Sequence, residues 1–157
     1  MALRYIADNS ASPMETILSM LMTLPYRLGG YNLPMPILNK RLEIPLETRK
    51  AVGKSYYECD IYWPQANVDL EYDSDTHHAE KVKIAMDSIR RDTLLAMGVT
   101  VITVTSRQIN NAMVLHEVAK TVAKLLGKRL QLPDDFEDKR SELRRQLLSG
   151  NQLPPEP

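Results

Sequence analysis

The chain has 157 residues, of which 43% are hydrophobic and 25% are charged, and its 20 basic residues balance its 20 acidic ones. This composition fits one soluble globular domain with its own core, without a strong non-specific attraction for nucleic acid. No apolar run is long enough to cross a bilayer, and the N-terminus has no signal-peptide pattern, so we expect a cytoplasmic protein with no membrane partner. The single cysteine, Cys59, excludes an internal disulfide and a cysteine-based zinc site.

The first predicted helix begins at the sequence SPME. Ser12 is its cap, Pro13 fits the first helical position, and Glu15 completes a capping box. Apolar residues follow at helical spacing until Pro25 ends the helix. Residues 25–38 are rich in Pro, Gly and Asn and are typical of a loop. A short strand is expected within residues 39–46, and residues 47–54 remain ambiguous.

Two strand-like runs, YYECDIYW and NVDLEYD, surround a turn at residues 64–67. If Trp63 pairs with Val68, position 62 faces 69, 60 faces 71 and 58 faces 73 in an antiparallel hairpin. Because side chains alternate along a strand, each face of this hairpin has its own set of residues. The first face would carry Glu58, Asp60, Tyr62, Asp69, Glu71 and Asp73. The second face would carry Tyr57, Cys59, Ile61, Trp63, Val68, Leu70 and Tyr72.

The second half of the chain predicts a helix over residues 79–97, a buried strand over 99–105 and a helix over 109–127. The inward stripe of the first helix would hold Val82, Met86, Ile89, Thr93 and Met97, and that of the second would hold Met113, Val114, Val118, Val122, Leu125 and Leu126. A last helix starts at residues 133–135 and a Pro-rich, disordered tail covers 150–157. We therefore predict an α/β fold: a small mixed sheet with an antiparallel hairpin, flanked by helices, with the strand at 99–105 parallel to the second hairpin strand.

The opposed carboxylates of the hairpin are its most informative feature. Directly opposed side chains have Cβ atoms roughly 4.5–5.5 Å apart, where like charges destabilise the sheet. A divalent cation would neutralise them, and oxygen ligands suit Mg²⁺ or Mn²⁺. Asp60 and Glu71 are the expected ligands, with Glu58 and Asp69 at the rim. The alternative is an exposed hairpin face with solvated carboxylates.

The ordered set of motifs resembles a known family. Asp60, the run from Glu71 through Asp73 to His77, and the sequence DSIRRD at 87–92 with Gly98 and a β-branched strand after it are similar to the endonuclease-like domain of unknown function 559 (DUF559). That family is similar to the very-short-patch-repair endonucleases of the PD-(D/E)xK superfamily. The resemblance covers about residues 11–127 and implies a restriction-endonuclease-like core at 1–130, with residues 131–157 as an added C-terminal helix and tail.

The resemblance also implies roles for single residues. Asp60 and Glu71 would bind the metal, Asp73 would replace the lysine of the superfamily, and His77 would transfer protons or contact phosphate. Glu15 would join the site from the opening helix. Asp87 and Arg91 match the helix motif, whereas Ser74 replaces a glycine of the family pattern and bears on the local turn. Simpler alternatives exist: His77 as an exposed turn residue, Glu15 as a capping residue only, and Asp87 in a helix pair with Arg90 or Arg91.

Three functions remain open at this stage. The first is a Mg²⁺- or Mn²⁺-dependent endonuclease that hydrolyses DNA, with backbone contacts from Lys81, Lys83, Arg90 and Arg91. The second is a catalytically weak or inactive module that binds DNA or a protein partner in a defence or toxin–antitoxin system. The third is assembly through the last helix, which has few apolar residues and could form a homodimer.

Overall fold

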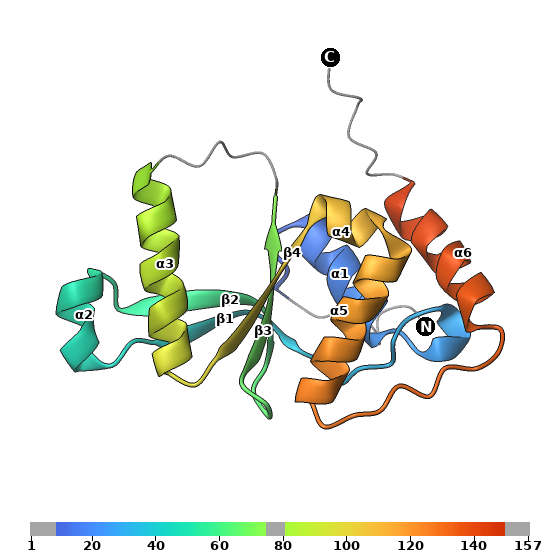
Figure 1. The fold of residues 1–157 in the computed structure, drawn as a ribbon, viewed down its shortest axis with the longest axis horizontal. Coiled ribbons are helices and arrows are strands. Elements are labelled where there is room, and N and C mark those ends of the chain that lie inside the picture. Colours follow the sequence, from blue (N-terminus) through green and yellow to red (C-terminus); the bar gives the residue numbers. More distant parts are fainter. Residues whose placement is uncertain (1–8, 75–80, 150–157) are drawn as a thin grey trace, which may run out of the picture.

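The computed structural model describes residues 9–74 and 81–149 and shows a mixed α/β fold built on a four-stranded sheet (Figure 1). The strands are β1 (Ile37–Glu43), β2 (Tyr56–Trp63), β3 (Val68–Asp73) and β4 (Thr100–Thr105). The helices are α1 (Pro13–Thr23), the 3-10 helix η2 (Tyr26–Leu28), α2 (Leu46–Val52), α3 (Lys81–Ala96), α4 (Ser106–Asn110), α5 (Ala112–Leu125) and α6 (Phe136–Leu148). The predicted α/β class is confirmed, and α2 occupies the segment that the sequence left ambiguous.

The strands lie in the order β1-β2-β3-β4. Strand β2 is antiparallel to both β1 and β3, and β4 is parallel to β3, as predicted. In the hairpin, Trp63 pairs with Val68 and Tyr62 with Asp69, so the predicted register is confirmed next to the turn. Both β2 and β3 are central strands, which places the hairpin in the middle of the sheet.

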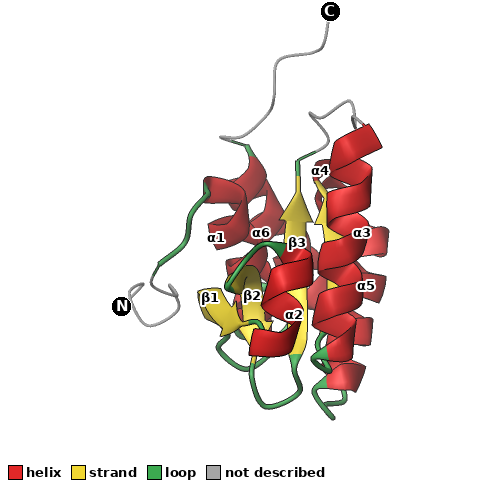
Figure 2. Cartoon of the chain, turned by 90° about the vertical axis from the view of Figure 1, so that its left-hand side faces the viewer, coloured by secondary structure: helices red, strands yellow, loops and turns green. Residues whose placement is uncertain are grey.

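Helices cover both faces of the sheet. In Figure 1, α3 lies on one face with α2 near the edge, and α1, α4, α5 and α6 lie on the other. Figure 2, viewed from the α2 side, shows α2 and α3 in front of the strands. The larger core lies on the α1 side and includes Leu18, Leu21, Ile61, Trp63, Leu70, Leu115 and Phe136, and the smaller core on the α3 side includes Ile44, Tyr57, Cys59, Tyr62, Leu94 and Val99. Among the described residues, no helix is both long enough and apolar enough to cross a bilayer.

The predicted inward stripe of α3 is only partly correct. Thr93 is buried, but Met86 and Ile89 are 52% and 47% exposed, and Leu94 fills the core instead. In Figure 1 the N-terminal end of α3 rises beyond β1 and β2.

The predicted helix at 109–127 is interrupted at Asn111. The side chain of this residue accepts hydrogen bonds from the N–H groups of Met113 and Val114, at 3.1 and 3.2 Å, and so caps the start of α5. Within α5, Met113 lies nine residues from the buried Val122 and hence on the opposite side of the helix, and it is 78% exposed. Leu125, also predicted to face inward, is 40% exposed. Val122 is buried as predicted, together with Leu115, Ala119 and Ala123.

Helix α6 packs on the core of its own chain. Phe136 and Leu143 are buried, and the ring of Phe136 lies 5.4 Å from that of Tyr31. Gly29 allows α6 to approach closely: its φ is +89°, and a Cβ atom there would lie 2.3 Å from the carbonyl oxygen of Lys139. The apolar residues of α6 thus face inward, and the homodimer through this helix stays a prediction.

Candidate active site

The cap of α1 positions Glu15. Ser12 accepts a hydrogen bond from the Glu15 N–H at 3.2 Å, and Pro13 occupies the first turn, as predicted. The Glu15 carboxylate accepts hydrogen bonds from the Ala11 N–H at 2.9 Å and from the Asn39 side chain at 3.2 Å. Glu15 is 7% exposed. The capping arrangement is therefore present, with Ala11 rather than Ser12 as the backbone donor, and it holds the carboxylate in the protein.

The hairpin departs from its predicted pairing at Asp60. Paired positions between β2 and β3 end at Ile61 and Leu70, so Asp60 does not face Glu71 in the ladder. Instead, Asp60 Oδ2 accepts a hydrogen bond from the Tyr72 N–H at 3.0 Å. The two strands diverge here, and the carboxylate of Asp60 lies where the ladder ends.

The predicted faces of the hairpin are wrong for the first half of β2. Tyr57 and Cys59 pack in the same cluster as Tyr62, whereas the prediction placed them on the opposite face. The ladder between β1 and β2 skips the Asn39–Asp60 pair, and Asn39 has a φ of +50°, a left-handed conformation that asparagine tolerates. This irregularity breaks the alternation of side chains along β2. Side chains in the first half of the strand therefore point to the face opposite the predicted one.

Asp60 shares its surroundings with two other carboxylates. The pKa of Asp60 is raised to about 6, first by burial and then by the negative charges of Glu15 and Glu71, while the hydrogen bond from the Tyr72 N–H and the charge of Arg90 lower it. Glu15 on α1 and Glu71 on β3 therefore both act electrostatically on Asp60 of β2. We call Glu15, Asp60, Asp69 and Glu71 the acidic cluster.

Asp69 lies inside the sheet–helix layer and not at the rim, as the sequence had suggested. Its side chain is fully buried beside the carboxylate of Glu71 and the thiol of Cys59. Burial, followed by the negative charge of Glu71, raises the pKa of Asp69 to about 9. Asp69 is therefore protonated at neutral pH, which removes one of the charges that the sequence set against each other.

Arg90 neutralises a second charge. Its Nη1 forms an ion pair with Glu71 Oε1, and its Nη2 donates a hydrogen bond to the carbonyl oxygen of Glu58 at 2.6 Å. Arg91 and Asp87 are exposed on α3, so Arg90, not Arg91, is the arginine that faces the acidic cluster. A sequence signal for this existed, because Arg90 lies four residues before the buried Leu94 and shares its helix face.

The remaining predicted residues lie away from the cluster or outside the described part of the chain. Asp73 is exposed at the end of β3. His77 lies outside the described residues, and so do the side chains of Lys81 and Lys83. Cys59 is buried and free, and burial raises the pKa of its thiol, which agrees with an unreactive cysteine.

Comparisons with protein-family models, with curated proteins and with solved structures find no match for this chain. Function therefore has to be inferred from the residues of the cluster and their surroundings.

Proposed function

We propose that this chain is a metal-dependent nuclease that hydrolyses phosphodiester bonds of DNA, with Asp60 and Glu71 as ligands of Mg²⁺ or Mn²⁺. One observation carries the proposal: Asp60 on β2 lies within electrostatic reach of Glu15 on α1 and Glu71 on β3, whose negative charges both raise its pKa. Cations relieve such repulsion, and an all-oxygen donor set suits hard divalent ions. A bound ion would supply Lewis acidity and an activated water.

The donor set fits an ion that keeps most of its water. Within residues 9–74 and 81–149, no group of three or more His, Cys, Asp or Glu side chains is assembled for a metal. Mg²⁺ needs only one or two carboxylates and retains several waters, so Asp60 and Glu71 are sufficient. Glu71 has one oxygen in the ion pair with Arg90 and a second oxygen for the metal.

Other residues would hold the ligands in place. The Tyr72 N–H fixes one oxygen of Asp60, Asn39 and Ala11 fix Glu15, and Arg90 orients Glu71. The order of elements, a helix, three antiparallel strands, a helix and a parallel strand, agrees with the restriction-endonuclease-like core that the DUF559 resemblance implies. Asp73 and His77 keep the roles that this resemblance gives them.

Nicking of a supercoiled plasmid in Mg²⁺ or Mn²⁺ tests the proposal. Asp60→Asn and Glu71→Gln keep the shape of each side chain and remove its charge. Because outer-shell partners alone are worth 10–100-fold, loss of a ligand should reduce nicking by about 100-fold or more. Asp138→Asn, at an exposed position of α6, is the matched control and should nick like the wild type. Equal nicking by all four proteins would exclude hydrolysis at this cluster.

A second candidate is a nuclease-fold module that binds DNA or a protein partner and cuts weakly or not at all. The Arg90–Glu71 ion pair favours it, because Arg90 already supplies a cation to the cluster. This candidate predicts a salt-sensitive gel shift without nicking, unchanged by Mg²⁺.

A further inference from the structure

A polar hollow of about 610 Å³ borders the acidic cluster. Its walls come from β1, the segment after α2, the start of β2 and α3, and they include Arg41, Lys54, Tyr56, Tyr57, Glu58 and Arg90. Arg90 links the two regions, because it lines the hollow and its guanidinium pairs with Glu71. The hollow therefore adjoins the proposed site of hydrolysis at Arg90.

Two tyrosines hold the cations of this hollow. The guanidinium carbon of Arg41 lies 4.7 Å from the ring centroid of Tyr56. Lys54 and Arg90 lie 5.6 and 5.5 Å from the ring centroid of Tyr57. Such cation–π contacts restrain long side chains that would otherwise be mobile. Three cationic side chains thus line one hollow. Its lining contains a single carboxylate, that of Glu58, which forms an ion pair with Arg41 at 3.1 Å.

We propose that this hollow binds the phosphate backbone of duplex DNA beside the acidic cluster, with Arg41 and Lys54 as positioning residues. The inference rests on the proposed function and names the surface that would hold its substrate. A chain with no net charge needs a local group of cations to hold a polyanion. A duplex fits better than a single strand, because Tyr57 is 5% exposed and the ring of Tyr56, which is 36% exposed, already has the Arg41 guanidinium over it.

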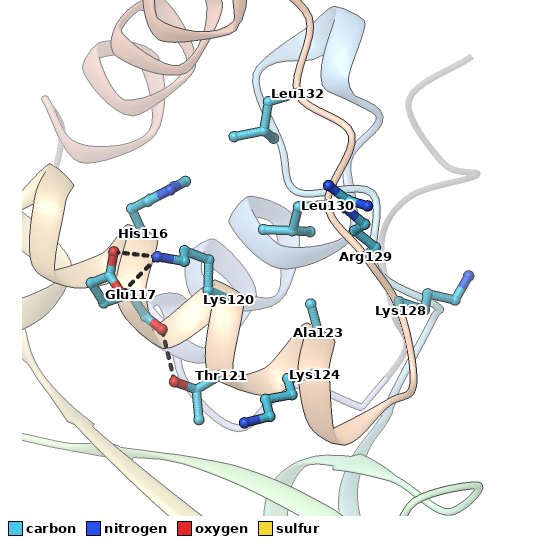
Figure 3. A pocket seen from close by; sticks show the side chains of 10 residues that line it. All are labelled: His116, Glu117, Lys120, Thr121, Ala123, Lys124, Lys128, Arg129, Leu130 and Leu132. Atoms are coloured by element: carbon cyan, nitrogen blue, oxygen red, sulfur yellow. Dashed lines mark hydrogen bonds and ion pairs between the residues drawn. The ribbon is translucent and has the colours of Figure 1, made fainter.

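A second basic hollow, of about 530 Å³, provides the comparison (Figure 3). It lies on α5 and the segment after it, with Lys120, Lys124, Lys128 and Arg129 spread around the apolar Leu130 and Leu132. Helix α5 covers the face of the sheet opposite α3, and none of the residues that line this hollow pairs with Glu71. Charge alone would favour this second hollow, whereas the ion pair between Arg90 and Glu71 favours the first.

The test is the affinity for a short fluorescein-labelled DNA duplex, measured by anisotropy in EDTA over a range of salt concentrations. The double variant Arg41→Gln/Lys54→Gln is compared with Lys124→Gln/Lys128→Gln, which removes the same charge from the second hollow. Each lost phosphate contact lowers the slope of log K against log salt by about 0.9, so the first variant should lower it by about 2 and weaken binding by about tenfold. The second variant should bind within about twofold of the wild type, and Arg41→Lys/Lys54→Arg should restore binding.

Four results would overturn the inference: equal losses in both double variants, a loss confined to the α5 variant, no loss in either double variant, or no duplex binding by the wild type. Melting curves of all variants separate lost contacts from lost folding. Nicking in Mg²⁺ is scored separately. If the wild type nicks DNA and Arg41→Gln/Lys54→Gln binds it unaltered, this inference is refuted and the proposed function stands. If binding is lost only in Arg41→Gln/Lys54→Gln and no protein nicks DNA, DNA binding at the hollow is supported and the proposed hydrolysis is refuted.

Discussion

Replacing Asp69 with asparagine should stabilise the protein at neutral and higher pH. The side chain is fully buried, and burial together with the charge of Glu71 raises its pKa to about 9. In an unfolded chain the pKa of aspartate is about 3.9. A carboxyl whose native pKa is raised contributes its full stability below the unfolded pKa, and that contribution is lost as the pH rises through the native pKa.

The size of the effect follows from the two pKa values. At pH 7 the carboxyl is still protonated in the native protein, whereas the pH is about three units above its pKa in the unfolded chain. Each unit corresponds to about 1.4 kcal/mol, so the loss in free energy of unfolding approaches about 4 kcal/mol. Asparagine has the same shape and carries no such penalty, although its amide group is buried in an apolar layer. We therefore expect Asp69→Asn to raise the free energy of unfolding by about 2–4 kcal/mol at pH 7 and by about zero at pH 4.

Urea unfolding in EDTA at acidic, neutral and mildly alkaline pH measures this difference. Asp138→Asn, on the exposed face of α6, is the matched control and should stay within about 0.5 kcal/mol of the wild type at every pH. The reasoning is refuted if Asp69→Asn is no more stable than the wild type above neutral pH, or if its effect does not change with pH.

Two further predictions concern the contacts that hold the site and the fold together. Arg90→Gln should destabilise the protein by about 1–3 kcal/mol, because it leaves the half-buried Glu71 without its cation, and a second change, Glu71→Gln, should recover part of this loss in a double-mutant cycle. An unchanged urea midpoint for Arg90→Gln would mean that the ion pair is not formed in solution. Gly29→Ala should lower the melting temperature more than Gly53→Ala, since both glycines have a positive φ but only at Gly29 would a Cβ atom strike a backbone carbonyl, that of Lys139. Equal effects of the two substitutions would show that α6 does not pack tightly against residue 29.

Local signals predicted much of the fold. The sequence SPME specified the start of α1, because capping and the preference of proline for the first turn depend on neighbouring residues alone. The turn at residues 64–67 placed Trp63 opposite Val68 for a similar reason. The β-branched run at 99–105 became a strand parallel to β3, as the intervening helix required.

The errors arose where distant segments decide the outcome. The irregularity at Asn39 and Asp60 depends on how β1 pairs with β2, and alternation within β2 alone gave Tyr57 and Cys59 the wrong face. Asp69 was placed at the rim because its burial requires β3 to be a central strand covered by α3. The parallel β4 beside β3 was the one signal that could have indicated a central strand.

In the candidate site, too, the sequence predicted what local signals determine and missed what depends on contacts between distant segments. The sequence identified Asp60, Glu71 and Glu15, and in the structure the charges of Glu15 and Glu71 both raise the pKa of Asp60. It missed the hollow of Arg41 and Lys54, because these cations are far from α3 in the sequence and meet Tyr56 and Tyr57 only in the fold. It also assumed that charge within the hairpin requires a metal, whereas the protonated Asp69 and the Arg90 ion pair relieve part of that charge.

A crystal soaked in Mn²⁺ tests the central claim most directly, through the anomalous scattering of the metal. The proposed function predicts a peak bound by the carboxylates of Asp60 and Glu71, absent from crystals of Asp60→Asn. No peak at the acidic cluster at millimolar Mn²⁺, or a peak that persists in Asp60→Asn, would contradict it.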